Sequence, residues 1–187
     1  RRMRVVQDAL RVAGWLETYT YSFSFEEETI ALGLHAVEHL RVVNPLNRDQ
    51  VRLRTSLLPN LFHQAWAAIK KGPIFRAYEI GRVYRAHRPR PKKTGRERPW
   101  QEGEPLRLSG LFVRRGADTR AADFYEVKGI VEHLLTTLQI RDVWFDDFEP
   151  TPESTFLSLW EIGQSAEVKC GEKTEVGMVG AVSHGVL

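Results

Sequence analysis

The sequence predicts an α+β domain with a mainly antiparallel sheet flanked by helices. Three observations support this fold class. Helical and strand-like patterns occur in groups instead of alternating strictly, short turns separate the strand-like segments, and no internal repeat is present. At 187 residues the chain is long enough for one domain that buries roughly 70% of its unfolded surface.

The N-terminal part of the chain predicts a helix, a strand and a second, short helix. Met3–Ala13 has helical periodicity, and Gly14 is a typical C-terminal cap. Leu16–Phe23 is rich in Thr and Tyr, which favour strands. Ser24 and Glu27 have the spacing of a capping box, so a short helix is expected to begin there.

A third helix is predicted after the Asn-Pro loop. Thr55 or Ser56 can cap it, Pro59 lies in its first turn, and it is expected to run to about Lys70 and to end at Gly72. The strongest later helix is Ala122–Leu138, with a buried face of Phe124, Val127, Val131, Leu134, Leu135 and Leu138. Strands are predicted at His39–Val43, Ile74–Tyr84, Leu106–Val113, Asp142–Phe148, Ala166–Cys170 and Glu175–Val182.

Composition limits the class of protein and reveals one unusual segment. Cys170 is the only cysteine, so no disulfide can form within the chain, and no apolar run approaches the ~18 residues of a membrane span. We therefore expect a cytoplasmic protein without a membrane partner. The net charge is +3, yet residues 85–98 hold seven Lys or Arg and one acid. This Pro-rich stretch predicts a flexible basic loop over residues 85–104.

Several segments carry a resemblance to a known family. In order, they are GWLETYTYSF, NPLNRDQVRLRTSLLPNLF, RAYEIGRVYRA, DFYEVKGIVEHLLTTL, GQSAEV and VGMVGAVSHGVL. They resemble the core of the bacterial phenylalanyl-tRNA synthetase β chain, a copy of the class II synthetase catalytic scaffold that does not perform aminoacylation. The resemblance departs at Trp160–Ser165, where the family usually has a turn like His-Pro-Gly-Arg-Ser. The family also continues beyond Leu187, which implies that the C-terminal part of the module is missing.

The signatures of an active class II enzyme are incomplete. Such enzymes use Phe-Arg-x-Glu and Gly-x-Gly-x-x-x-Arg to hold ATP and to stabilise charge on its phosphates. The first falls on Tyr84–His87, where Arg85 keeps the arginine and His87 replaces the glutamate. The second is missing, because no two glycines are separated by a single residue. We therefore predict no catalytic and no ATP-binding residue in this chain.

The first helix predicts a subunit interface. Its apolar residues cover about half of its circumference, more than one sheet face needs, so part of the helix should meet a partner. The resemblance places this element at the dimerisation motif of class II synthetases, against the catalytic α subunit. The predicted interface residues are Met3, Val6, Leu10, Ala13 and Trp15. The alternative is that both sides of the helix belong to the core.

Two further sites were considered. His35 to His39 has the His-x-x-Glu-His spacing of one metalloprotease group, but the segment runs into a strand-like stretch, so no metal site is predicted. The basic loop could contact tRNA phosphates through Arg88, Arg90, Lys92, Lys93 and Arg96, although a solvated loop is the simpler interpretation. Glu126, Glu132, His133, Asp146, Asp147 and Glu149 are expected to be surface groups, and Trp15, Trp66, Trp144 and Trp160 core or interface aromatics.

These observations predict the non-catalytic core of a phenylalanine–tRNA ligase β subunit. By resemblance, the whole enzyme is an α2β2 assembly that charges tRNA(Phe) with phenylalanine, using ATP and Mg²⁺, and this part supports the catalytic α subunit without binding a cofactor. One alternative is a free-standing class II-like paralogue that binds RNA or regulates another enzyme. Another is a degenerate adenylating ligase that still uses Arg85.

Overall fold

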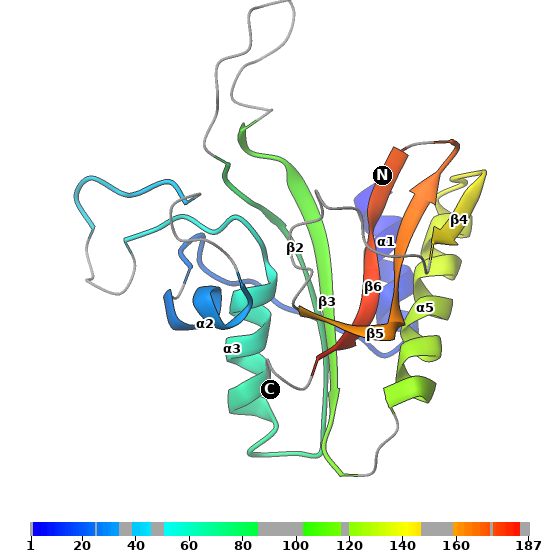
Figure 1. The fold of residues 1–187 in the computed structure, drawn as a ribbon, viewed down its shortest axis with the longest axis horizontal. Helices are drawn as coiled ribbons and strands as arrows, with labels where there is room; N and C mark the ends of the chain where they lie inside the picture. Colours follow the sequence, from blue (N-terminus) through cyan, green and yellow to red (C-terminus); the bar gives the residue numbers. More distant parts are fainter. Residues whose placement is uncertain are drawn as a thin grey trace, which may run out of the picture. The chain divides into compact units, whose positions relative to one another are not determined.

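The computed structural model describes residues 2–24, 26–33, 39–45, 51–85, 103–116, 120–146, 159–172 and 174–183. The chain divides into two compact units. We call Glu17–Arg114 the hairpin unit, and Arg1–Leu16 together with Arg115–Leu187 the terminal unit. Both contain helices and antiparallel strand pairs (Figure 1), which confirms the predicted α+β class. The described strands form two three-stranded sheets, β1-β2-β3 and β4-β5-β6, where one sheet was expected.

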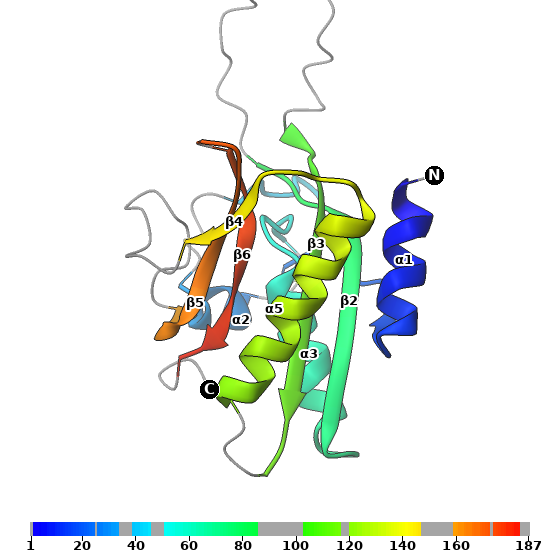
Figure 2. The same cartoon turned by 90° about the vertical axis from the view of Figure 1, so that its right-hand side faces the viewer.

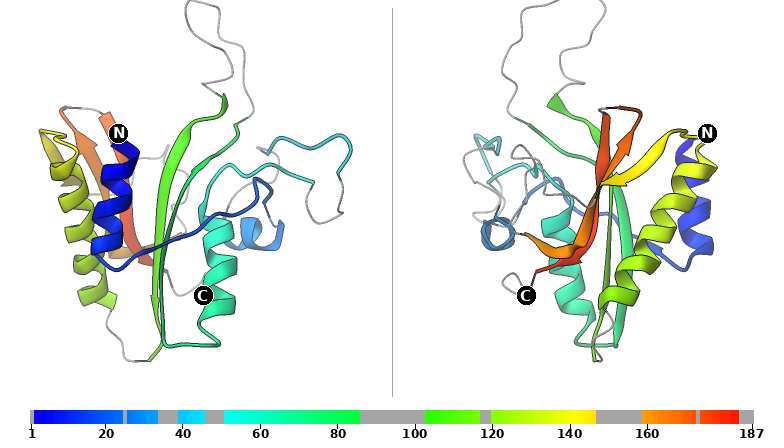
Figure 3. Two further views of the ribbon diagram at one scale, coloured as in Figure 1. Left: turned by 180° about the vertical axis from the view of Figure 1, so that it is seen from behind. Right: turned by 45° about the vertical axis from the view of Figure 1, so that its right-hand side comes forward.

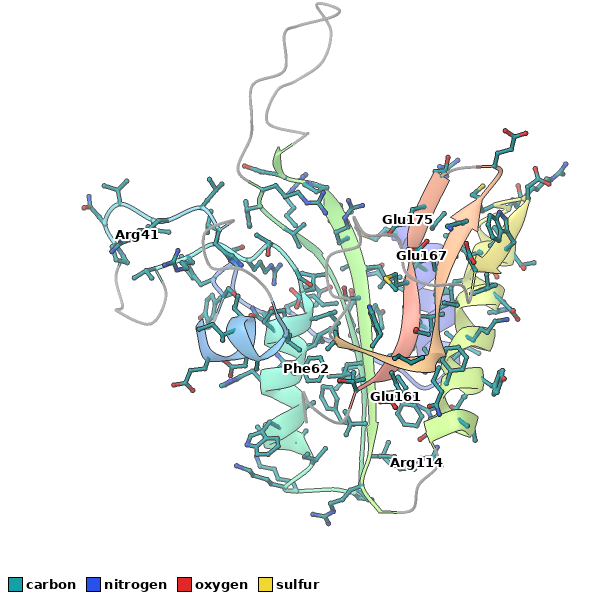
Figure 4. The ribbon with its side chains drawn as sticks, viewed as in Figure 1. Arg41, Phe62, Arg114, Glu161, Glu167 and Glu175 are labelled. Carbon is teal, nitrogen blue, oxygen red and sulfur yellow. The ribbon has the colours of Figure 1, made fainter. Side chains whose placement is uncertain are left out.

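The hairpin unit is built on two long antiparallel strands, β2 (Ile74–Arg82) and β3 (Leu106–Arg114). Helix α3 (Leu58–Ala68) packs on one face of the hairpin, and α2 (Glu26–Ala31) contacts α3. The apolar cluster between helix and hairpin consists of Leu61, Ala65 and Leu111, with Leu58, Phe62, Phe75 and Val113 around it. Phe62 is labelled on α3 in Figure 4.

Helix α3 confirms the prediction with small shifts at its ends. Ser56 Oγ accepts a hydrogen bond from Leu58 N at 3.2 Å, which satisfies one amide of the first turn, and Pro59 lies in that turn as expected. The helix ends at Ala68, two residues before the predicted end, and Gly72 N donates to Ala68 O at 3.1 Å.

Two of the predicted strands of the hairpin unit are much shorter than expected. Strand β1 covers only Leu16–Glu17, and the remainder of the Leu16–Phe23 prediction is wrong. Beyond it the chain retains one isolated bridge, Phe23 to Leu53. Likewise, the predicted strand His39–Val43 is reduced to a bridge between Arg41 and Arg52. In the first segment, side-chain hydrogen bonds replace the backbone ladder, as the next subsection shows.

The terminal unit packs one long helix on a three-stranded sheet. Helix α5 (Arg120–Thr137) covers one face of β4 (Val143–Asp146), β5 (Trp160–Cys170) and β6 (Thr174–Val182), as Figure 2 and the right view of Figure 3 show. Its buried cluster is Leu135, Ala166, Val168 and Val179, packed against Phe124, Val127, Val131, Ile140, Val143 and Phe145. Helix α1 (Arg2–Val12) contacts α5 (Figure 3, left), and Gly14 follows α1 with φ of 78°. This left-handed conformation is the one expected of a helix-ending glycine.

Strand β5 begins earlier than predicted and contains an irregularity. Its first residues, Trp160–Ser165, are those at which the family resemblance departs. Pairing with β6 shifts register between Trp160 and Ser165, and Gly163 has φ of 79°. A bulge therefore takes up these residues within the strand.

Within the described part of the chain, no helix has both the length and the apolar character needed to span a membrane.

Candidate functional site

A buried ion pair joins the two stretches of sequence that carry most of the resemblance. Arg54, from LRTSLLPNL, and Glu79, in β2, are 25 residues apart, and their Nη1 and Oε1 atoms lie 2.8 Å apart. The two side chains are 4% and 2% exposed. Arg54 Nε also donates to Arg82 O at 2.9 Å, and Tyr84 N donates to Arg54 O at 2.8 Å. Arg54 therefore fixes the segment before α3 against the end of β2.

Thr20 and Asn60 complete this buried polar cluster. Thr20 Oγ1 donates to Glu79 Oε2 at 2.7 Å and accepts from Arg54 Nη1 at 2.8 Å and Asn60 Nδ2 at 3.0 Å. Asn60 Nδ2 also lies 2.9 Å from Tyr21 O and 3.1 Å from Phe23 O. These bonds hold the segment that follows β1, and they explain why it leaves the sheet: its polar groups bond to side chains of α3 and β2. The four residues Arg54, Glu79, Thr20 and Asn60 are called the buried polar cluster below.

The cluster covers the face of the hairpin that carries Glu79 and Gly81. A Cβ atom added at Gly81 would lie 2.4 Å from Arg54 Nη2 and 3.1 Å from Leu57 Cδ2, so both side chains rest directly on the strand. A nucleotide on this face would have to displace them. The guanidinium of Arg54 already neutralises Glu79 and is not available to a phosphate. The residues of this face do not fit ATP.

Arg85 stands at the end of the hairpin stem. Its side chain is exposed, and its backbone N donates to Gly103 O at 2.9 Å, while Val83 N donates to Pro105 O at 3.1 Å. The antiparallel pairing therefore continues past the ends of β2 and β3. His87 and the predicted RNA-contacting residues Arg88, Arg90, Lys92, Lys93 and Arg96 lie outside the described residues. RNA contact by this loop stays a prediction.

The predicted interface residues of α1 divide into two groups. Leu10 and Trp15 are buried within the chain, and Val6 and Ala13 are half-buried. Met3 is 51% exposed. Part of the apolar arc therefore belongs to the chain's own core, as the width of the arc suggested, and Met3 remains accessible. Whether a partner covers the accessible part is not tested by this geometry and stays a proposal.

The histidine of the metal-like motif that the structure describes is already hydrogen bonded through both ring nitrogens. His39 Nδ1 lies 2.9 Å from Leu53 O, and Nε2 lies 3.3 Å from Thr55 Oγ1. His35 and Glu38 lie outside the described residues. Among the residues with assigned positions, no three His, Cys, Asp or Glu side chains converge as metal ligands would.

Other predicted surface groups include one that sequence analysis underrated. Glu126, Glu132 and His133 are exposed on α5, as expected. Asp146, however, lies 2.5 Å from Lys169 Nζ, which also lies 2.9 Å from Glu167 Oε2 (Glu167 is labelled on β5 in Figure 4). Asp147 and Glu149 lie outside the described residues.

The predicted aromatic residues also differ in their burial. Trp15 is buried and Trp160 is half-buried, which agrees with a core role. Trp66 and Trp144 are exposed, and each lies near a lysine: Lys70 Nζ is 5.6 Å from the Trp66 ring and Lys169 Nζ is 5.1 Å from the Trp144 ring.

Sequence analysis missed the buried polar cluster, although it left a signal. Glu79 is a lone acid in an otherwise strand-like stretch, and Arg54 is a lone base beside an apolar helix start. Lone charges at inward-facing positions require partners of opposite charge, so these two could have been paired.

Comparison with known proteins was made against families, sequences and solved structures. A family model described as the phenylalanyl tRNA synthetase beta chain CLM domain matches residues 1–187. A phenylalanine–tRNA ligase beta subunit of Moorella thermoacetica is 33% identical over 97% of this chain and 22% of that protein. One of Solibacter usitatus is 38% identical over 78% of this chain and 18% of its own length. The chain thus spans about a fifth of the length of these relatives.

Solved structures support the same fold. The pyrrolysyl-tRNA synthetase PylSc of Desulfitobacterium hafniense superposes with a TM-score of 0.61, at 18% identity, over 93% of this chain and 53% of its own. A Bacillus halodurans protein described as an ATP phosphoribosyltransferase regulatory subunit/histidyl-tRNA synthetase gives 0.59 at 15% identity, over 78% of this chain and 35% of its own. At these identities the likeness concerns the fold. Together with the match over the whole chain, it leads to one conclusion: the chain belongs to the family of phenylalanyl-tRNA synthetase β-chain CLM domains.

Proposed function

We propose that this chain is the non-catalytic core of a phenylalanine–tRNA ligase β subunit, and that it holds the catalytic α subunit in an active α2β2 assembly. The whole enzyme would charge tRNA(Phe) with phenylalanine in the cytoplasm, and ATP and Mg²⁺ would bind to the α subunit. The observation that carries this proposal is the position of Arg54 and Leu57 over Gly81, where they occupy the surface that a nucleotide would need.

Adenylate formation requires cations that are free to meet the developing charge on the α-phosphate. In this chain, the guanidinium of Arg54 is paired with Glu79 inside the protein. Removing it from Glu79 would leave a buried carboxylate without a counter-charge, which is strongly unfavourable. The cluster therefore suits a rigid scaffold better than a site that must bind and release nucleotide.

The first test separates a scaffold from an enzyme. We expect the chain alone to show no ATP–pyrophosphate exchange. With the α subunit of the same organism, exchange should be restored, and Arg85→Ala should leave its rate within about threefold. Arg85 is exposed, so this change should not disturb folding, which circular dichroism can check. Exchange by the isolated chain, or a hundredfold loss in Arg85→Ala, would contradict the proposal and favour a degenerate ligase.

The second test addresses the interface. Met3→Asp places a charge on the accessible part of the apolar arc of α1, so it should abolish co-purification with the α subunit and leave the free chain folded. Arg4→Asp, on the opposite arc of the same helix, is the matched control and should co-purify normally. Leu10→Asp should also prevent folding, because Leu10 is buried. Normal assembly by Met3→Asp would place the interface elsewhere.

The proposed contact with tRNA depends on the basic loop. Neutralising Lys92, Lys93 and Arg96 together should weaken tRNA binding and lower its dependence on salt, since each phosphate contact contributes a salt-sensitive increment. Unchanged binding across a salt series would remove the loop from the proposed interface.

A further inference from the structure

The segment after β1 has an inverted distribution of side chains. Its hydroxyl groups point inward and form hydrogen bonds, and its tyrosines point outward. Tyr19 and Tyr21 are 74% and 78% exposed, two residues apart and therefore on one side of an extended chain. The inward hydroxyls are those of Thr18 (to Gln64 Oε1, 2.6 Å), Thr20 (in the buried polar cluster), Ser22 (to Tyr84 Oη, 3.2 Å) and Ser24 (to Thr29 Oγ1, 2.5 Å). A segment stabilised only by apolar burial would place its aromatic rings inside.

A cavity of about 240 Å³ lies beside the two tyrosines, within the hairpin unit. One wall is the segment itself and the other is α3; the lining residues are Tyr19, Thr20, Tyr21, Phe23, Ser24, Asn60, His63 and Gln64. Sites for cofactors and drug-sized ligands usually measure roughly 300–1,000 Å³. This cavity is smaller than that range, and its size suits a single side chain. We call it the tyrosine cavity.

The groups around the tyrosine cavity are mainly hydrogen-bond acceptors whose neighbouring donors are already in use. Tyr19 Oη donates to Glu17 Oε1 at 2.9 Å, and His63 Nδ1 lies 2.6 Å from Glu28 Oε1. Each of these two lining residues therefore brings a carboxylate to the edge of the cavity. The hydrogen bond to Glu17 also raises the pKa of Tyr19, so its ring stays a neutral phenol. Asn60 directs its amide nitrogen away to Thr20, Tyr21 and Phe23.

This chemistry selects a cation. The faces of tyrosine rings attract positive charge, and the carboxylates of Glu17 and Glu28 add to that attraction. A guanidinium group meets both requirements, because it is planar, stacks on aromatic rings and donates several hydrogen bonds. Nucleic acid is disfavoured, because the same carboxylates would repel its phosphates.

We propose that the tyrosine cavity receives an arginine side chain of a partner protein, stacked between Tyr19 and Tyr21 and balanced by Glu17 and Glu28. The buried polar cluster holds the tyrosines in place before the partner arrives, which lowers the entropic cost of binding. This interaction surface lies in the hairpin unit, goes beyond the proposed role of α1, and does not depend on it.

The experiment is a titration of the ¹⁵N-labelled chain, followed by NMR, with N-acetyl-arginine amide. We expect saturable shifts at the Asn60 side-chain amide and at the backbone amides of Tyr19 and Tyr21. N-acetyl-citrulline amide has nearly the same shape without the charge, and it should bind at least tenfold more weakly. Binding of the citrulline compound with equal strength, or arginine-induced shifts confined to other residues, would overturn the proposal.

Variants test which groups carry the interaction. Tyr21→Ala should weaken arginine binding at least fivefold, and Glu28→Gln should weaken it in the same direction. Tyr125→Ala removes an equally exposed tyrosine on α5 and should change nothing. A short oligouridylate is the nucleic-acid arm of the test: shifts at Tyr19 and Tyr21 with the oligonucleotide, and none with arginine, would assign the surface to RNA and refute the proposal. No α subunit or ATP is present, so these outcomes are separate from the tests of the proposed function.

Discussion

The two units stabilise their polar groups in opposite ways. In the hairpin unit, Arg54 and Glu79 are buried with Thr20 and Asn60 beneath the surface, and they connect three stretches of chain. In the terminal unit, the side of the sheet against α5 is apolar, and Lys169, Asp146 and Glu167 form their ion pairs through residues of the register opposite to Val143, Phe145 and Val168.

The difference teaches which unit depends on complete hydrogen bonding. An apolar core tolerates replacements of similar shape, because contact area is not directional. A buried ionic cluster does not, because each removed partner leaves another group without its counter-charge. The hairpin unit should therefore be the more sensitive of the two to single substitutions that preserve volume.

The largest expected effect follows from removing the charge of Arg54. Arg54→Met keeps much of the side-chain length and leaves Glu79 buried and unpaired, which should lower the free energy of unfolding by roughly 3–5 kcal/mol. Urea denaturation followed by tryptophan fluorescence measures it.

The matched control for Arg54→Met lies in the terminal unit. Leu135→Met, in the apolar cluster with α5, should cost less than about 1.5 kcal/mol. The double variant Arg54→Met/Glu79→Met should recover part of the loss, because it removes both charges. Equal losses at Arg54 and Leu135 would show that the contrast between the units is not real.

A smaller effect is expected from the hydroxyl group of Thr20. Thr20→Val preserves the shape of the side chain and removes a donor to Glu79 and an acceptor for Arg54 and Asn60, so it should cost about 1–3 kcal/mol. The same urea experiment measures it. Thr18→Val, which removes only the bond to Gln64, is a useful control and should cost less. A Thr20→Val protein as stable as the parent would show that the cluster does not need its centre.

The smallest effect concerns pH and separates the two ion-pair systems. Hydrogen bonds to Asp146 and then to Glu167 raise the pKa of Lys169, so its pairs stabilise the folded state fully below the usual lysine pKa of about 10.4. The contribution is lost as pH rises through the raised value. The stability gap between the parent and Lys169→Met should therefore narrow in urea denaturation only above about pH 10.4.

Lys169→Arg provides the control for this pH effect, because a guanidinium does not deprotonate in that range and should keep its pairs. The Arg54 pair should likewise be insensitive between pH 8 and 11. A gap for Lys169→Met that stays constant across this range would mean that the lysine pairs add nothing to stability.

Elements with strong periodicity were predicted well from the residues. The helices at α1, α3 and α5 and the strands β2, β3 and β6 appear close to their expected positions. Their patterns are local, since apolar residues at helical or alternating spacing select one conformation without reference to distant segments. The family, too, was recognisable from ordered motifs, and the match over residues 1–187 confirms it.

The segment from Thr18 to Ser22 shows where such reasoning fails. Alternating Thr and Tyr side chains favour a strand, but alternation alone does not say which set faces inward. Here the hydroxyl groups face inward because Glu79, Arg54 and Gln64 offer them partners from β2, α3 and the segment before it. Those partners are distant in sequence.

The residues alone therefore specify the class of fold, the principal helices and strands, and the loss of the class II signatures. Three-dimensional folding decides the pairing of Arg54 with Glu79, the covering of Gly81 and the outward tyrosines. The physical reason is range: periodicity and capping act over a few neighbouring residues, whereas a buried charge acquires its partner only when segments far apart in the chain are brought into contact.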